Sequence, residues 1–227
     1  MLTLGNLLNS KYKITIVKKF LRFEKKINIF NKVLFIEGDK SLSIRWALLA
    51  SHAVGKSTAY NLLNSEDVLN TLSCLKKLGI KINLNKNKCE IFGKGLKSFN
   101  YKKNTNLNCG NSGTLARLIL GLLVDTPHKI KITGDESLSK RDFSRITKPL
   151  KKFGVKFFPP NGKSLPLAVL GSNKLKSINY IENKGSAQCK SAVMLASLKT
   201  RGITKIIAKK SRNHTELLFN FLNIPIS

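Results

Sequence analysis

The chain has 227 residues, of which 42% are apolar, so it can bury a core in one large domain or two small ones. It is strongly basic, with 41 Lys and Arg against 12 Asp and Glu and a net charge of +29. No apolar run approaches the roughly 18 residues that span a membrane, so we predict no membrane partner.

The lysines are scattered among many asparagines, a pattern that indicates general compositional bias more than a binding stripe. We expect most lysines to be solvated and a smaller number to shape a basic cleft for small anions. A basic, non-enzymatic nucleic-acid-binding module is the alternative. It would need aromatic side chains interleaved with basic ones, and no such run is present. We therefore predict no specific nucleic-acid partner.

The four cysteines, at positions 74, 89, 109 and 189, are widely separated, and only three histidines are present. Because no Cys-x-x-Cys pair occurs, the sequence predicts neither a metal site nor a disulfide framework. Unpaired cysteines fit a reducing compartment, and we predict a cytoplasmic protein.

Residues 11–32 are basic and poor in acids, which is compatible with a targeting segment or an amphipathic surface helix. Alternation around Ile14 and Ile16, and again around Leu34 and Ile36, favours short strands. We predict an ordinary strand-and-loop entry to the fold, without clear chemistry.

The sequence Gly-Asp-Lys-Ser-Leu-Ser-Ile-Arg at residues 38–45 places a glycine turn, hydroxyls and cations directly before an apolar helix. Free backbone N–H groups at a helix start favour anions, and Lys40 and Arg45 would add formal charge. The segment predicts either an anion site or a capped helix with solvated cations.

Residues 50–58 partly match a nucleotide-binding P-loop around Gly55, but Ala50 stands where the motif requires its first glycine. A P-loop also needs a strand leading into it, whereas the preceding residues have helical spacing. We predict a turn between a helix and a strand instead.

A second helix is predicted to begin at Ser65, with a hydroxyl cap and acids in its first turn. Two lysines and Gly79 predict its end and a left-handed cap. Strands are expected from about residue 80 and over residues 89–92.

The sequence of residues 75–82 is repeated with small changes at residues 150–157, and a weaker match occupies residues 221–226. Upstream of each copy, a turn rich in small and hydroxyl residues opens an apolar helix, at residues 38–45, 110–114 and 185–188. This pattern predicts three repeats of about 70 residues, with buried helices inside and sheets outside.

Three such helix starts, related by approximate symmetry, can converge on one end of the domain. Glycines and hydroxyls could serve close helix packing alone. The cations beside these turns favour a phosphate or carboxylate site as well; they are Lys40, Arg45, Arg141 and Arg212.

Six motifs lie in a fixed order along the chain: Gly-Asp-Lys-Ser-Leu-Ser-Ile-Arg (38–45), Ser-Glu-Asp-Val (65–68), Gly-Asn-Ser-Gly-Thr (110–114), Gly-Asp-Glu-Ser-Leu-Ser-Lys-Arg (134–141), Gly-Ser-Ala-Gln-Cys-Lys-Ser-Ala (185–192) and Ser-Arg-Asn-His-Thr-Glu (211–216). In this order they resemble the N-terminal half of the 5-enolpyruvylshikimate-3-phosphate synthases, the 3-phosphoshikimate 1-carboxyvinyltransferases. The resemblance extends from about residue 35 to the last residue.

The resemblance implies an α/β fold, the enolpyruvyl transferase inside-out α/β barrel (α-β prism) of βαβαββ repeats, with one domain of the usual two. Residues 1–34 would be an N-terminal segment that is normally part of the other domain, and residues 35–227 the enolpyruvyl transferase domain. Its repeats would span about 35–105, 106–178 and 179–227, the last truncated.

The family transfers the enolpyruvyl group of phosphoenolpyruvate to the 5-hydroxyl of shikimate 3-phosphate and releases phosphate, on the route to chorismate and the aromatic amino acids. The resemblance implies no cofactor and no metal. Lysine and arginine suit this reaction because two phosphates and a carboxylate must be held close together.

By resemblance, the residues that bind shikimate 3-phosphate would be Lys40, Ser41, Arg45, Ser186, Ala187, Gln188 and Arg212. Those that bind phosphoenolpyruvate would be Lys40, Asn111, Gly113, Arg141 and Gln188. Arg117, one turn into a helix, is predicted to be structural.

The chain departs from the family pattern at several positions. Glu37 stands where Pro is usual, Ile44 where His or Asn is usual, and Ser112 where Ala is usual. Arg141 is followed by Asp142 and Phe143 rather than by Pro-Met. Asp142 would weaken anion binding by Arg141 unless its carboxylate points away.

Members of the family are nearly twice as long, and their acid/base residues lie in the second domain. We therefore predict no catalytic residue in this half and little activity for this chain alone, as a truncated or split half that a separate C-terminal half would complete. A UDP-N-acetylglucosamine carboxyvinyltransferase-like enzyme is the alternative, since it shares the fold. The Gly-Asp-Lys-Ser motif at residues 38–41 favours the shikimate enzyme.

Overall fold

The computed structural model describes residues 14–17, 20–23, 31, 33–34, 36–86 and 88–227. It contains two compact units, residues 1–36 and residues 37–227. In the first unit, β1 (Ile14–Val17) pairs antiparallel with β2 (Phe20–Phe23). The strand predicted around Ile14 is confirmed. The strand predicted around Leu34 and Ile36 is wrong for these two residues, which lie outside any strand, and residue 35 lies outside the described residues.

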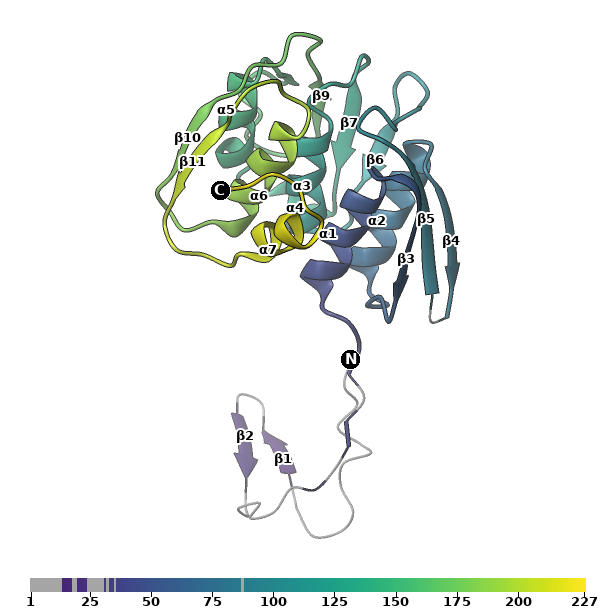
Figure 1. The fold of residues 1–227 in the computed structure, drawn as a ribbon. Coiled ribbons are helices and arrows are strands. Elements are labelled where there is room, and N and C mark those ends of the chain that lie inside the picture. Colours follow the sequence, from purple (N-terminus) through teal and green to yellow (C-terminus); the bar gives the residue numbers. More distant parts are fainter. Residues whose placement is uncertain (1–13, 18–19, 24–30, 32, 35, 87) are drawn as a thin grey trace. The chain divides into compact units, whose positions relative to one another are not determined.

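The second unit contains three successive groups of elements (Figure 1). The first group comprises α1 (Lys40–Ala50), β3 (Val54–Tyr60), α2 (Glu66–Lys77), β4 (Lys81–Asn85) and β5 (Lys88–Lys94). The second comprises β6 (Asn106–Asn108), α3 (Gly113–Leu122), β7 (Ile130–Thr133), α4 (Glu136–Ser139), α5 (Ser144–Lys152), β8 (Lys156–Phe158) and β9 (Leu167–Leu170). The third comprises β10 (Asn179–Glu182), α6 (Ala187–Ser197), β11 (Lys205–Ala208) and α7 (His214–Phe221).

Each group shares part of its connectivity with another. In the first sheet, β5 lies between β3 and β4 and is antiparallel to both; in the second, β9 stands in the same relation to β7 and β8. The parallel pair β6 and β7 corresponds to the parallel pair β10 and β11. This arrangement agrees with the predicted repeats, and their bounds stay a prediction. Within the described residues the third sheet contains the two strands β10 and β11.

The central helices begin with the same local bond in all three repeats. The side chains of Asp39, Ser112 and Ser186 each accept a hydrogen bond from the backbone N–H three residues later, which satisfies one of the free donors of a helix start. In contrast, Ser65 occupies the predicted N-cap of α2, but its buried hydroxyl has no hydrogen-bond partner among the described residues.

The segment between α1 and β3 agrees with the turn predicted there. The helix ends at Ala50 and β3 starts at Val54, so a helix precedes this turn where a P-loop would require a strand. Gly55 has a φ of 88°, a left-handed backbone that favours glycine.

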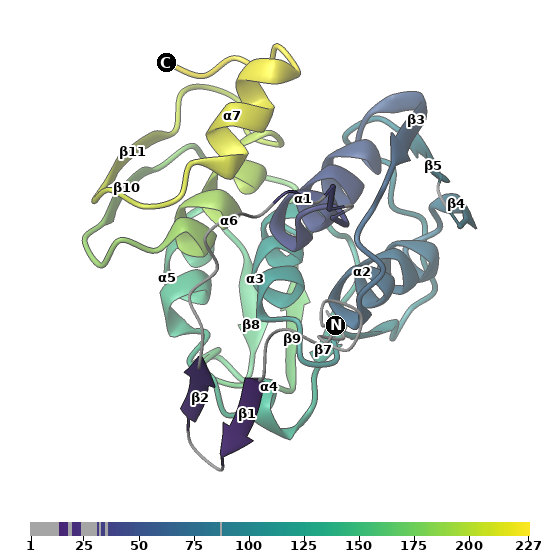
Figure 2. The ribbon, with the colours of Figure 1, turned by 90° about the horizontal axis from the view of Figure 1, so that it is seen from below.

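The core is built around the central helices α1, α3 and α6, with further buried side chains from α2, α5 and the strands, and the three sheets of this unit lie on the outside (Figures 1 and 2). Every residue of α3 except Arg117 is buried. Helices α3 and α6 approach closely at Gly121, where an added Cβ would lie 2.3 Å from the carbonyl oxygen of Ala192. None of the helices in the described ranges combines the length and apolarity that crossing a membrane requires.

Candidate functional site

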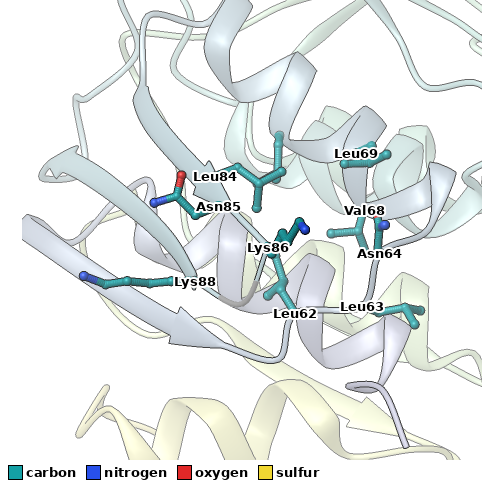
Figure 3. Close-up of a pocket in the computed structure, with 10 residues that line it drawn as sticks. Leu62, Leu63, Asn64, Val68, Leu69, Leu84, Asn85, Lys86 and Lys88 are labelled. Carbon is teal, nitrogen blue, oxygen red and sulfur yellow. The ribbon is translucent and has the colours of Figure 1, made fainter.

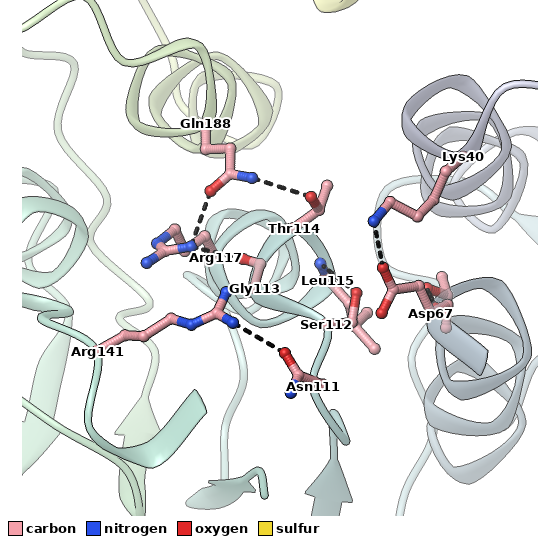
Figure 4. A network of polar contacts seen from close by, with 11 residues as sticks. Lys40, Asp67, Asn111, Ser112, Gly113, Thr114, Leu115, Arg117, Arg141 and Gln188 are labelled. Atoms are coloured by element: carbon pink, nitrogen blue, oxygen red, sulfur yellow. Dashed lines mark hydrogen bonds and ion pairs between the residues drawn. The ribbon is translucent and has the colours of Figure 1, made fainter. Parts of the chain in front are cut away.

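The starts of α1, α3 and α6 lie at one end of the helical core. Lys40 is the first residue of α1, Gly113 the first of α3, and Gln188 the second of α6. Figure 4 shows Lys40 and Gln188 on either side of the α3 start. The first N–H groups of a helix and its dipole together favour anions, so this end is electrostatically suited to negative ligands.

Arg141 lies beside the α3 start and is held by an amide. Its Nη2 donates to Asn111 Oδ1 at 2.8 Å, and Asn111 Nδ2 donates to Asp135 Oδ2 at 2.6 Å. Asp135 also caps α4 by accepting from the Leu138 N–H. The Arg141 guanidinium is thus positioned by the neutral amide of Asn111. The carboxylate of Asp135 bonds to that amide and not to the guanidinium.

Gln188 is bonded at both ends of its amide (Figure 4). Its Oε1 accepts from Arg117 Nη1 at 2.9 Å, and its Nε2 donates to Thr114 Oγ1 at 2.9 Å. These bonds join the first turns of α3 and α6. They bring Gln188 into the same cluster as Gly113.

Gly113 lies between two guanidinium groups. A Cβ added to it would lie 2.6 Å from Arg117 Nη1 and 2.8 Å from Arg141 Nη1. A side chain at this position would therefore displace both cations. Glycine keeps the two guanidinium groups close together over the start of α3.

The departure at Asp142 and Phe143 is accommodated by local structure. Asp142 accepts from the N–H and the hydroxyl of Ser144, at 2.8 and 2.9 Å, and these bonds lower the pKa of Asp142. Its carboxylate is therefore engaged with the start of α5. Phe143 is fully buried, and the Arg117 guanidinium lies 5.3 Å from the centre of its ring.

Lys40 is not part of the Gln188 cluster in this structure. Its Nζ pairs with Asp67 at the start of α2, at 2.8 Å, and half of its side chain is exposed. Ser41 lies next to it, and the Ser41 carbonyl accepts from Arg45 at 3.0 Å.

Arg45 lies inside the helical packing, 4% exposed. Its Nε donates to Thr215 Oγ1 at 2.8 Å and its Nη2 to Ser191 Oγ at 3.3 Å, so it joins α1 to α6 and α7. Burial lowers the pKa of Arg45. Arg212 is exposed in the segment before α7, and its charge also acts on Arg45.

Ser186 and Ala187 lie at the start of α6, where the Ser186 N–H donates to Glu182 Oε2 at 2.6 Å. Glu182 also accepts from Arg145 Nη2 at 2.9 Å. Burial alone would raise the pKa of Glu182, but these bonds outweigh it and hold the pKa low. Glu182 and Arg145 therefore fix the predicted turn.

Sequence reasoning missed Glu182, Arg145 and Thr114, and it assigned Arg117 a structural role. One signal was available for Arg117. It is the only charged residue in an otherwise apolar helix, and it follows Gly113 by four residues, so the two lie on one face.

Two cavities lie away from this cluster. One, of about 260 Å³, lies between α2 and β4, with Val68 and Leu84 facing it and Lys86 and Lys88 beside it (Figure 3). The other, of about 740 Å³, lies at the opposite end of the helical core and includes Lys199. No group of three or more His, Cys, Asp or Glu in the described part of the chain could hold a metal ion.

Comparisons with known proteins identify the family. Residues 25–227 match the family EPSP synthase (3-phosphoshikimate 1-carboxyvinyltransferase). The 3-phosphoshikimate 1-carboxyvinyltransferase of Bacillus subtilis (strain 168) is 38% identical over 204 residues, which are 89% of this chain and 47% of that protein. The enzyme of the same name from Streptococcus pyogenes serotype M2 is 42% identical over 183 residues, 80% of this chain and 42% of that protein.

The solved structures agree with this family. EPSP synthase from Acinetobacter baumannii superposes with a TM-score of 0.76 at 34% identity, covering 82% of this chain and 42% of that one. The chain thus spans less than half the length of these relatives. The fold is accordingly that of the inside-out α/β enolpyruvyl transferases. By its sequence and its structure, the chain belongs to the EPSP synthase family.

Proposed function

We propose that this chain carries one half of the site at which the enolpyruvyl group of phosphoenolpyruvate is transferred to the 5-hydroxyl of shikimate 3-phosphate, with release of phosphate. The observation that carries this proposal is the cluster around Gly113. Arg117 and Arg141 converge there on one helix start, and neither forms an ion pair with an acid within the described residues. Two cations with only neutral partners leave their charge available for an anion.

The family motifs suggest a role for each residue. Arg141, Asn111 and Gly113 would receive the phosphoenolpyruvate, because an exposed amide and a half-buried guanidinium flank a position without a side chain. Ser186, Ala187 and Gln188 at the start of α6 would bind shikimate 3-phosphate together with Ser41 and Arg212. Lys40 would exchange Asp67 for the substrates, since the pair is exposed to solvent and weak.

Arg45 requires a separate proposal. Its guanidinium is buried against Thr215 and Ser191, so we propose that it supports the shikimate 3-phosphate side of the site while its remaining N–H groups reach the ligand. This assignment predicts that Arg45→Lys lowers both affinity and stability.

We propose that the acid/base residues lie in the part of the family's fold that this chain does not span, and that a separate C-terminal half is its partner. Half a site binds one face of each substrate. Shikimate 3-phosphate binding with little turnover is therefore expected of the chain alone. A cytoplasmic location remains a prediction.

The test is calorimetric titration of the purified chain with shikimate 3-phosphate and, separately, with UDP-N-acetylglucosamine. We expect binding of shikimate 3-phosphate only. Absence of binding, or preference for the nucleotide sugar, would contradict the proposal. Phosphate release with both substrates, measured without and with a polypeptide for the second half, tests completion of the site. Normal turnover by the chain alone would overturn the half-site assignment.

A matched pair of lysines provides the control. Lys40 and Lys56 are 50% and 54% exposed, and their acid partners Asp67 and Glu90 are 19% and 17% exposed. Lys40→Met should lower shikimate 3-phosphate affinity about tenfold or more, because a charge-assisted bond contributes roughly 1.5–3 kcal/mol. Lys56→Met on β3 should leave the affinity unchanged. Equal losses would indicate a non-specific effect of net charge.

A further inference from the structure

Arg117 contacts Gln188, a residue of the proposed site, rather than lying apart from it. Its Nη1 donates to Gln188 Oε1 at 2.9 Å and to the Gly113 carbonyl at 3.3 Å. The Gln188 amide nitrogen donates to Thr114 Oγ1 at 2.9 Å. Arg117 and Thr114 belong to the first turns of α3, so α3 holds both ends of an amide that α6 carries.

This arrangement fixes the direction of the Gln188 amide. A guanidinium has donors and no acceptor, so only the amide oxygen can face Arg117. The amide nitrogen then faces Thr114, and one of its two N–H groups remains for a ligand. If the amide turned over, it would present its carbonyl oxygen to a phosphate, which accepts hydrogen bonds and would be repelled.

Arg117 is itself fixed in place. It packs on the buried ring of Phe143 at 5.3 Å, and burial lowers its pKa. A guanidinium remains charged at neutral pH even so, and its planar fork can stack on a ring while it bonds to two acceptors. Lysine lacks the planar group and cannot make the same set of contacts.

We propose that Arg117 is a positioning residue: it orients the side-chain amide of Gln188 so that an N–H group faces the phosphorylated ligand. Arg117 acts through Gln188 and does not need to touch the ligand. This inference rests on the proposed function and deepens it by adding a residue to the site. It also gives Phe143 a role, as the surface on which Arg117 is held.

A double-mutant cycle tests the inference. The chain, Arg117→Lys, Gln188→Ala and the double variant are titrated with shikimate 3-phosphate. We expect each single substitution to weaken binding about tenfold and the double variant to bind no more weakly than Gln188→Ala, because residues that act through one contact are not additive. A further tenfold loss in the double variant would overturn the inference, as would unchanged affinity in Arg117→Lys. Arg201→Lys, an exposed arginine at the other end of the core, is the control.

Thr114→Val tests the same amide in a chain that keeps Arg117, so its result does not depend on whether the arginine variants fold. It removes the acceptor at the other end of the amide without changing charge, so we expect a smaller loss of affinity that disappears in the Gln188→Ala background. Gln188→Glu keeps the contact with Arg117 but removes the amide N–H. It should weaken binding at least as much as Gln188→Ala, whereas unchanged affinity would contradict the required N–H group.

A second readout needs no ligand and separates the two proposals. In the ¹⁵N-labelled chain, the side-chain amide signals of Gln188 are those absent from Gln188→Ala. We expect these signals to shift and to exchange faster with water in Arg117→Lys, and to remain unchanged in Arg201→Lys. If the parent chain binds no shikimate 3-phosphate, the proposed function fails, and this experiment still decides the inference. Unchanged Gln188 signals in Arg117→Lys would overturn it.

Discussion

Two arginines at the amino ends of the central helices and a lysine at their carboxyl ends are held in opposite ways. At the amino end, Arg117 and Arg141 bond to the neutral amides of Gln188 and Asn111. At the carboxyl end, Lys199 follows α6 and pairs with Asp125 at 2.7 Å, with a side chain only 3% exposed. The charge of Lys199 is buried and paired with an acid. The charges of Arg117 and Arg141 are held by groups that do not neutralise them, whereas Lys40, at the same end, forms a half-exposed ion pair with Asp67.

The helix dipoles account for this division. The amino ends carry partial positive charge and favour anions, and the carboxyl ends favour cations. The cavity of about 740 Å³ at the carboxyl end contains Lys97, Lys174, Lys199 and Arg201 among its lining residues. We interpret these cations as compensation for three sets of helix carbonyls.

The largest expected effect is at the carboxyl end. Asp125→Asn would leave Lys199 buried without its counter-charge, so the free energy of unfolding should fall by about 3–5 kcal/mol. Urea unfolding of both chains measures this difference. If the free energy of unfolding fell by less than about 1 kcal/mol in Asp125→Asn, the ion pair of Lys199 would not serve the fold, and the proposed difference between the two helix ends would be wrong.

His52, which follows α1 at the same end, adds a dependence on pH. Burial lowers its pKa from 6.5 to about 3, and the charge of Lys199 acts in the same direction. In the unfolded chain His52 binds a proton as the pH falls through about 6.5, whereas in the folded chain it binds one only near pH 3. The stability due to His52 is therefore complete above pH 6.5 and is lost as the pH falls toward 3.

His52→Gln cannot titrate in this range. Between pH 7 and pH 4 it should lose about 3 kcal/mol less stability than the parent chain, at about 1.4 kcal/mol per pKa unit. Unfolding curves at both pH values give the comparison. Parallel losses in the two chains would show that folding does not lower the pKa of His52.

At the amino end, Arg141→Gln should affect binding and spare the fold. We expect phosphoenolpyruvate affinity, measured with shikimate 3-phosphate present, to fall about tenfold, or about 1.4 kcal/mol. The free energy of unfolding should change by less than about 1 kcal/mol, because the partner of Arg141 is an exposed amide. Arg201→Gln is the control. Destabilisation like that of Asp125→Asn would mean that this cation is structural.

The smallest effect is expected for Asp67→Asn, which removes the acid partner of Lys40. Because Lys40 is half exposed, water replaces the lost contact, and stability should fall by less than about 1 kcal/mol. Urea unfolding beside Asp125→Asn gives the comparison. A loss of several kcal/mol would show that exposure does not distinguish the two ion pairs.

The helix starts could be predicted from the sequence because their signals are local. A cap at Asp39, Ser112 or Ser186 and an apolar helix after it require only neighbouring residues, and the recurrence of the pattern gave the repeats. The family motifs then indicated Gly113, Arg141 and Gln188 as proposed substrate-binding residues. The structure brings these three residues into one cluster.

Interactions between distant residues could not be predicted. Alternation around Leu34 and Ile36 predicted a strand, but both residues lie outside any strand, so a local pattern does not decide strand formation by itself. The contact of Arg117 with Gln188 joins residues 71 positions apart, so a local pattern could not predict it. Ser65 marked a helix start correctly, but the missing bond of its hydroxyl depends on the packing around it.

Gly121 has a consequence for how this site can change during evolution. Its missing side chain sets the separation of α3 and α6, and those helices carry Arg117 and Gln188. Gly121→Ala would push the Ala192 backbone away and move the two residues apart without altering either. Selection for ligand recognition should therefore constrain a position one helix turn beyond Arg117 that no ligand ever meets.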